Sequence, residues 1–188
     1  MRFFIAIFLI FINTSPLFAA SFSCQAAKKE IERMICNTPQ LNQTDKQMGE
    51  AYRNLRKVLS KSERYVLLKD QRAWLQERNI ELQTCIEPDC ELHFYQIRIQ
   101  QLGPIEQASF DCQKATTSIE RRICSSQLLR HADGRVAKLY QPLQDDLRDN
   151  QQKWLKERNL ELSQPYCDIE CAWQLYKYRI EFLVRYTF

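Results

Sequence analysis

The feature that most constrains this 188-residue chain is a nine-residue stretch, residues 74–82, that occurs again at residues 154–162. Seven of the nine positions are identical, and the other two differ only as Gln/Lys and Ile/Leu. A repeat of this kind indicates that one structural unit is present twice. Within the stretch, Trp74, Arg78 and Leu82 fall at helical spacing, which predicts a helix that packs through its Trp and Leu side chains.

The two copies divide the chain into a first unit at residues 21–102, a linker at 103–108 and a second unit at 109–188. Each unit reads as a short helix followed by three longer ones, and only three glycines in the chain disfavour an all-β fold. We therefore predict an all-α protein of two tandem, disulfide-stapled small helical bundles. The offset between the copies falls from 88 to 80 residues, so eight residues are missing from the second unit near residues 148–150.

The second helix of each unit is predicted from an apolar stripe at steps of three and four residues. The stripe runs from Leu41 to Leu59 in the first unit and from Leu129 to Leu147 in the second. Pro142 lies inside the second stripe and should kink that helix or end it early. Aromatic residues on the helix stripes are predicted core anchors rather than ligand platforms. These anchors are Tyr52, Trp74, Tyr140 and Trp154.

The N-terminus has the pattern of a secretory signal peptide. Arg2 precedes ten apolar residues, and small residues near position 20 offer a cleavage site. The apolar run is too short to cross a bilayer, which requires about 18 or more such residues. Because the residues before Cys24 make a poor lipidation site, we expect residues 1–20 to be removed and the protein to be periplasmic or secreted, soluble and without a membrane anchor.

Eight cysteines, four in each unit, predict disulfides in an exported chain. Repeat symmetry favours two bonds in each unit: Cys24–Cys36, Cys85–Cys90, Cys112–Cys124 and Cys167–Cys171. The twelve-residue pairs need a loop that folds back, because a straight helix of that length spans about 18 Å. A capping box at Thr117 and Glu120 allows this by starting the short helix only near Ser118 and ending it near Cys124. The competing pattern joins the first segment to the later hairpin, for example Cys24 to Cys85.

Charge and composition exclude several classes of function. Without Arg2 the chain has 26 basic and 23 acidic residues, evenly shared between the units, so a nucleic-acid partner is not expected. The two histidines, His93 and His131, do not occupy matching repeat positions, and the cysteine spacing is not that of a zinc site. We find no constellation of a nucleophile and base, and no glycine-rich phosphate loop. The sequence thus predicts no enzyme activity, no metal and no cofactor.

Two buried ion pairs are predicted from charged residues on otherwise apolar stripes. Asp45 and Arg78 lie at equal distances from the expected turn between two antiparallel helices, and so do Asp133 and Arg158. An unpaired charge in such a position would be costly, so we expect Asp45 to pair with Arg78 and Asp133 with Arg158. A structural role is favoured over a catalytic one for both pairs.

The order of motifs resembles one known family. Each unit has Phe-x-Cys, Glu-Arg-x-Ile-Cys, a Leu-Asp-Tyr helix, Gln-x-x-Trp-Leu-x-Glu-Arg-Asn, and a Cys pair followed by Tyr-x-x-Arg-Ile. This order is similar to the LprI-type lysozyme inhibitor N-terminal domain, and the resemblance covers nearly all of the predicted mature chain. It implies an all-helical, disulfide-bonded, exported bacterial module and lysozyme inhibition. The chain differs from the family pattern in having two copies and no lipidation site, and no inhibitory residue is carried over.

From these observations we expect an exported binding module of the bacterial envelope with a protein partner, and lysozyme is the leading candidate. The alternative is a non-inhibitory structural or interaction module of the periplasm. The near-neutral charge gives no long-range steering towards a basic lysozyme, so contact would depend on a local acidic or polar loop. The candidates lie at the two predicted hairpin tips: Glu87, Asp89, Asp168 and Glu170.

Overall fold

The computed structural model describes residues 21–85 and 89–187, and all regular secondary structure in this part of the chain is helical. The first repeat contains η1 (Cys24–Ala26), α1 (Glu30–Asn37), α2 (Pro39–Val58), α3 (Lys61–Thr84) and α4 (Cys90–Leu102). The second contains η2 (Cys112–Lys114), α5 (Ser118–Cys124), α6 (Gln127–Tyr140), η3 (Gln141–Leu143), α7 (Gln144–Leu162) and α8 (Ile169–Tyr186). The prediction of two all-α bundles, each with one short and three longer helices, is confirmed.

Reciprocal side-chain caps stand at the start of α3 and α5. In α3 the Ser60 hydroxyl accepts from the Glu63 backbone N–H, and the Glu63 carboxylate accepts from the Ser60 N–H at 2.8 Å. Thr117 and Glu120 make the same reciprocal pair at the start of α5. Each box satisfies backbone donors that the first helical turn leaves without partners. The short helix α5 spans Ser118–Cys124, the bounds expected from its capping box.

The hairpin between the second and third helices differs between the repeats. In the first repeat α2 has 20 residues and α3 has 24, whereas α6 has 14 and α7 has 19. Helix α6 ends two residues before Pro142, which lies in η3, and the backbone is non-helical again at Leu147 (φ −115°, ψ 16°). The helix thus ends early at Pro142, as the sequence predicts, and the apolar stripe continues beyond it to Leu147 in separate segments. Proline cannot donate the next helical hydrogen bond, so the chain turns over residues 141–147.

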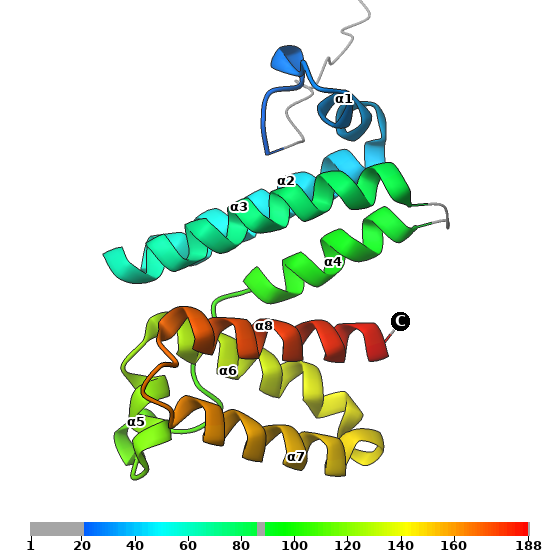
Figure 1. Ribbon diagram of the computed structural model, residues 1–188. Helices are drawn as coiled ribbons and strands as arrows, with labels where there is room; N and C mark the ends of the chain where they lie inside the picture. Colours follow the sequence, from blue (N-terminus) through cyan, green and yellow to red (C-terminus); the bar gives the residue numbers. More distant parts are fainter. Residues whose placement is uncertain (1–20, 86–88, 188) are drawn as a thin grey trace, which may run out of the picture.

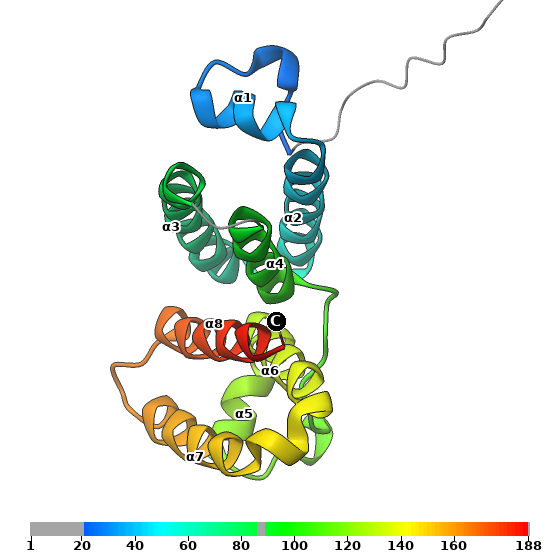
Figure 2. The ribbon, with the colours of Figure 1, turned by 90° about the vertical axis from the view of Figure 1, so that its right-hand side faces the viewer.

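The two repeats meet along α4 and α8, which lie side by side and antiparallel in the middle of the molecule (Figures 1 and 2). Helices α2 and α6 pack against α4 and α8 respectively, while α3 and α7 form the third long helix of each bundle. Apolar side chains from both repeats belong to one continuous buried core. The largest fully buried side chains include Trp173, Tyr95 and Tyr176, all on α4 or α8.

Polar contacts also join the repeats. One carboxylate oxygen of Glu63 on α3 accepts from the Ser126 hydroxyl (2.8 Å) and the Leu128 backbone N–H (3.0 Å) at the start of α6. Asp70 of α3 accepts from Arg98 of its own repeat (2.7 Å) and from Lys177 of α8 (2.9 Å). Helix α3 of the first repeat thus contacts two helices of the second repeat through carboxylates.

Among residues 21–85 and 89–187, no helix combines the length and hydropathy needed to span a bilayer.

Candidate functional site

The first cluster of predicted site residues lies between α2, α3 and α4. Arg78 Nη1 donates to Asp45 Oδ1 at 3.2 Å, and the Tyr95 hydroxyl donates to the same oxygen at 2.8 Å. The Ser21 backbone N–H donates to the other carboxylate oxygen at 2.7 Å. Asp45 is fully buried, so these three donors replace the water that its charge would otherwise bind.

The second repeat builds the same cluster from matching residues. Arg158 and the Tyr176 hydroxyl both donate to Asp133 Oδ1 at 3.0 Å, and the backbone N–H of Ser109 donates to Oδ2 at 2.8 Å. Burial raises the pKa of Tyr176, as it does that of Tyr95, so both hydroxyls stay protonated donors. In both clusters every carboxylate oxygen therefore accepts a hydrogen bond.

Tyr95 and Tyr176 were not among the residues assigned to these clusters from the sequence, although they coincide between the repeats. Each repeat also begins with a serine, Ser21 in the first and Ser109 in the second, at matching positions. Their coincidence is the signal that could have identified them as partners of the two aspartates.

Four disulfides are present, each inside one repeat. Their Cα–Cα distances lie between 5.1 and 5.8 Å, and they join Cys24 to Cys36, Cys85 to Cys90, Cys112 to Cys124, and Cys167 to Cys171. The short 3-10 segments η1 and η2 fold the chain back, which brings the ends of the twelve-residue loops together. Two of the bonds lie beside Glu81 and Glu161, but a cysteine in a disulfide offers no thiolate to a metal.

The acidic hairpin tips are less free than the sequence suggests. Glu87 lies outside the described residues, and Asp89 is exposed at the start of α4 with φ at 65°. Asp168 accepts from the backbone N–H groups of Glu170 and Cys171, so its carboxylate caps α8. Glu170 forms an ion pair at 2.7 Å with Lys69 of α3 in the other repeat. Two of the four candidate acids are therefore engaged in contacts that hold the fold.

The four predicted core anchors are not equally buried. Trp74 is only 5% exposed, with Phe94 stacked on it (5.5 Å between ring centroids) and Tyr95 at its edge. Trp154, Tyr52 and Tyr140 are partly buried and pack against the core from its edge. The difference between Trp74 and Trp154 is informative, because they occupy the same position of the repeat.

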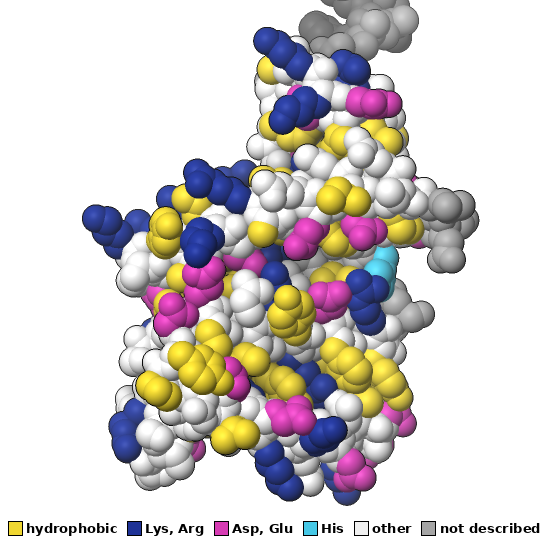
Figure 3. All heavy atoms as spheres, viewed as in Figure 1, with side chains coloured by type: hydrophobic (Ala, Val, Ile, Leu, Met, Phe, Trp, Pro, Cys, Tyr) yellow, Lys and Arg dark blue, Asp and Glu magenta, His cyan; other side chains and the backbone are white. Residues whose placement is uncertain are grey.

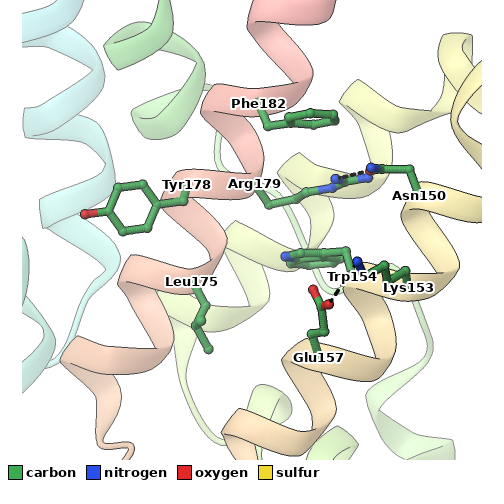
Figure 4. A pocket seen from close by; sticks show the side chains of 8 residues that line it. All are labelled: Asn150, Lys153, Trp154, Glu157, Leu175, Tyr178, Arg179 and Phe182. Atoms are coloured by element: carbon green, nitrogen blue, oxygen red, sulfur yellow. Dashed lines mark hydrogen bonds and ion pairs between the residues drawn. The ribbon is translucent and has the colours of Figure 1, made fainter.

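Trp154 lies in a surface groove between α7 and α8 with a volume of about 340 Å³ (Figure 4). Arg179 lies between the Trp154 ring (5.4 Å to the centroid) and the Phe182 ring (4.7 Å). The polar side chains Asn150, Lys153 and Glu157 and the apolar side chains Leu175 and Tyr178 complete the groove. The groove thus combines exposed aromatic surface with a cation held in a fixed orientation.

The corresponding surface of the first repeat is largely filled. It is built from the residues at the matching repeat positions. These pairs are Trp74/Trp154, Glu77/Glu157, Phe94/Leu175, Ile97/Tyr178 and Gln101/Phe182. There, the remaining space has a volume of about 80 Å³ and is bounded by Lys177, Tyr178, Glu181 and Arg185 of α8. Side chains of the second repeat therefore close the groove of the first.

In the second repeat no α4 side chain lines the groove, and it remains open. Over α7 and α8, in the lower half of Figure 3, apolar side chains lie on both sides of basic ones on this face. Tyr178 at the rim is 64% exposed, and Phe182 and Tyr186 are also exposed. Sequence reasoning missed the groove because it followed positions that are identical in the two copies. The groove arises where the copies differ, at Asp70/Asn150, Phe94/Leu175 and Gln101/Phe182.

The fold and these sites define a class of protein: a disulfide-bonded, all-helical tandem module whose clearest candidate site is a groove for binding. Comparison with known families identifies the particular family. The model of the family described as "Lysozyme inhibitor LprI" matches residues 23–102 and again residues 111–183, so the chain belongs to this family and contains two copies of its domain. No curated protein and no solved structure matches the chain.

Proposed function

We propose that the protein is an exported module of the bacterial envelope that binds and inhibits a lysozyme. The observation that carries this proposal is the match of both repeats to an inhibitor family, which together covers most of the chain. The signal-peptide pattern of residues 1–20 supports export, and four disulfides suit an oxidising compartment. The module acts by occupying its partner rather than by chemistry of its own.

The α7–α8 groove is the surface that we assign to the partner. Tryptophan, tyrosine and arginine are the residue types that most often dominate binding energy at protein interfaces, and Trp154, Tyr178 and Arg179 meet here. The surrounding charges are mixed, since Lys153 and Glu157 form an exposed ion pair at 3.8 Å. Short-range packing would therefore contribute more to affinity than long-range attraction.

A lysis assay tests the proposal with a matched pair of variants. The purified protein without residues 1–20 is titrated into cell-wall lysis reactions with several lysozymes. Tyr178→Ala should raise the concentration for half-inhibition about tenfold, because it removes an exposed aromatic contact of roughly 1.4 kcal/mol. Tyr65→Ala should leave inhibition unchanged, since Tyr65 is equally exposed (63%) beside a lysine but lies on α3, outside the groove.

The outcomes separate the alternatives. No inhibition of any lysozyme at a large molar excess would remove the inhibitor function and leave a non-inhibitory interaction protein. If inhibition is present but Tyr178→Ala and Tyr65→Ala behave alike, the groove is not the inhibitory surface. Substituting the hairpin-tip acids Asp89 and Glu170 would then show whether the tips bind the lysozyme.

A further inference from the structure

The two repeats hold the same arginine in different ways. In the first repeat the buried Arg98 donates to the carboxylate of Asp70 at 2.7 Å and to Gln71. The other carboxylate oxygen of Asp70 forms an ion pair with Lys177 of α8. One carboxylate therefore lies between two cations, and Arg98 has a counter-ion within its own repeat.

In the second repeat that carboxylate is absent, because Asn150 stands where the first repeat has Asp70. Arg179, the counterpart of Arg98, donates to Asn150 at 2.6 Å and to Gln151 at 2.5 and 3.0 Å. Both acceptors are neutral amides, and none of the ion pairs within residues 21–85 and 89–187 includes Arg179. Burial lowers the pKa of this guanidinium, so its charge is held at a cost that no carboxylate offsets.

Arg179 is only 5% exposed, but it forms part of the wall of the groove. Arg179 lines the groove between the flat faces of Trp154 and Phe182, and Figure 4 shows the stack from the side. The other charges that line the groove, Lys153 and Glu157, offset each other. The groove thus presents one net positive charge between two aromatic rings.

The structure also indicates what kind of group fills such a groove. In the first repeat the side chain of Lys177, from the neighbouring helix α8, borders the corresponding space and pairs with Asp70. In α4 the residue that matches Lys177 is Gln96, which is uncharged. Gln100, one turn later, accepts a hydrogen bond from Arg135. The second groove is therefore left for a group from outside the chain.

We propose that the α7–α8 groove binds an acidic side chain of a protein partner. The carboxylate of a glutamate or aspartate pairs with Arg179, while its apolar stem and neighbouring residue lie against Trp154 and Phe182. A side chain fits better than a freely diffusing carboxylate, because aromatic walls favour a ligand with an apolar flank. The inference rests on the proposed function only in taking the partner to be a protein.

The test uses Asn150→Asp, which gives Arg179 the internal counter-ion that Arg98 has. The control is Gln152→Glu, which adds the same charge to an exposed position two residues further along α7, on the opposite side of that helix. Binding is followed by NMR at the indole N–H of Trp154 and the Nε–H of Arg179. Three probes are titrated into each protein: acetyl-Phe-Glu-amide, acetyl-Phe-Gln-amide and N-acetylmuramic acid.

The Glu peptide should give saturable shifts, and the Gln peptide should bind at least about tenfold more weakly. Asn150→Asp should weaken Glu-peptide binding by about tenfold or more, while Gln152→Glu binds like the wild type. Three results would overturn the proposal: equal binding of the two peptides, wild-type binding by Asn150→Asp, or tighter binding of N-acetylmuramic acid than of the Glu peptide. The last would indicate a site for sugar acids.

Because these titrations contain no lysozyme, failure of the two ideas can be told apart. Lysozyme inhibition without Glu-peptide binding would overturn the acidic-side-chain inference alone. Selective Glu-peptide binding without inhibition of any lysozyme would overturn the inhibitor function and keep the site.

Discussion

At the scale of single residues, we expect the stability of the fold to depend on buried carboxylates whose two oxygens both accept hydrogen bonds. Asp45 and Asp133 each accept from an arginine, a tyrosine hydroxyl and a serine backbone N–H. Burying such a pair is close to neutral in free energy, but leaving one charge behind is expensive. The clusters therefore oppose any arrangement of the helices that separates the partners.

A double-mutant cycle on Asp45 and Arg78 measures this dependence. Asp45→Leu or Arg78→Met alone should lower the free energy of unfolding by roughly 3–5 kcal/mol, whereas the double variant should lose much less. Urea unfolding of the oxidised protein gives the values. The exposed Lys153–Glu157 pair serves as the control, and removing either partner there should have little effect. Small, additive losses at Asp45 and Arg78 would contradict a coupled buried pair.

At the scale of helices, residue patterns predicted the existence and order of the elements. Helical spacing around Trp74 and the capping box at Thr117 depend on local chemistry, so they can be read from a single sequence. Pro142 predicted that the second long stripe breaks, but its exact end could not be read, because Leu143 and Leu147 continue the apolar stripe past the proline. The groove could not be predicted from local pattern, since it depends on which repeat reaches across to the other.

Helix α3 shows how a local cap becomes a long-range contact. Glu63→Ala should lower the free energy of unfolding by roughly 1–3 kcal/mol, because Ser60, Ser126 and Leu128 all lose their acceptor. Urea unfolding of this variant is compared with that of Glu120→Ala. Glu120 makes the same capping box on the exposed side of α5, so its loss should be smaller. Equal losses would mean that the contact between repeats adds nothing.

At the scale of the whole molecule, Asp70 links the two repeats, and its contribution to the stability of the fold depends on pH. Burial alone would raise the pKa of Asp70, but Arg98 and Lys177 lower it to about 2, below the ordinary value of 3.8. A carboxyl whose pKa is lower in the folded state than in the unfolded state stabilises the fold when the pH is above the unfolded pKa. This stabilisation, about 2 kcal/mol, is lost as the pH falls from about 5 to about 2.

Asp70→Asn isolates this contribution. The difference in free energy of unfolding between wild type and variant should be large at pH 5 and should shrink as the pH approaches 2. Urea unfolding at both pH values, with disulfides intact, measures the difference, and the other carboxylates cancel because both proteins contain them. An equal difference at both pH values would show that Asp70 does not titrate as its partners imply. The variant also reproduces in the first repeat the Asn–Arg arrangement of the second.

Each of the four disulfides joins a cysteine to the next cysteine along the chain, so the bonds follow one another without crossing. A polypeptide that enters an oxidising compartment with its N-terminus first would therefore present every thiol to its correct partner before any later thiol arrives. Simple oxidation in order of arrival yields the native set, with no need to reshuffle bonds. In such a compartment the first repeat would form its two bonds before the cysteines of the second repeat arrive.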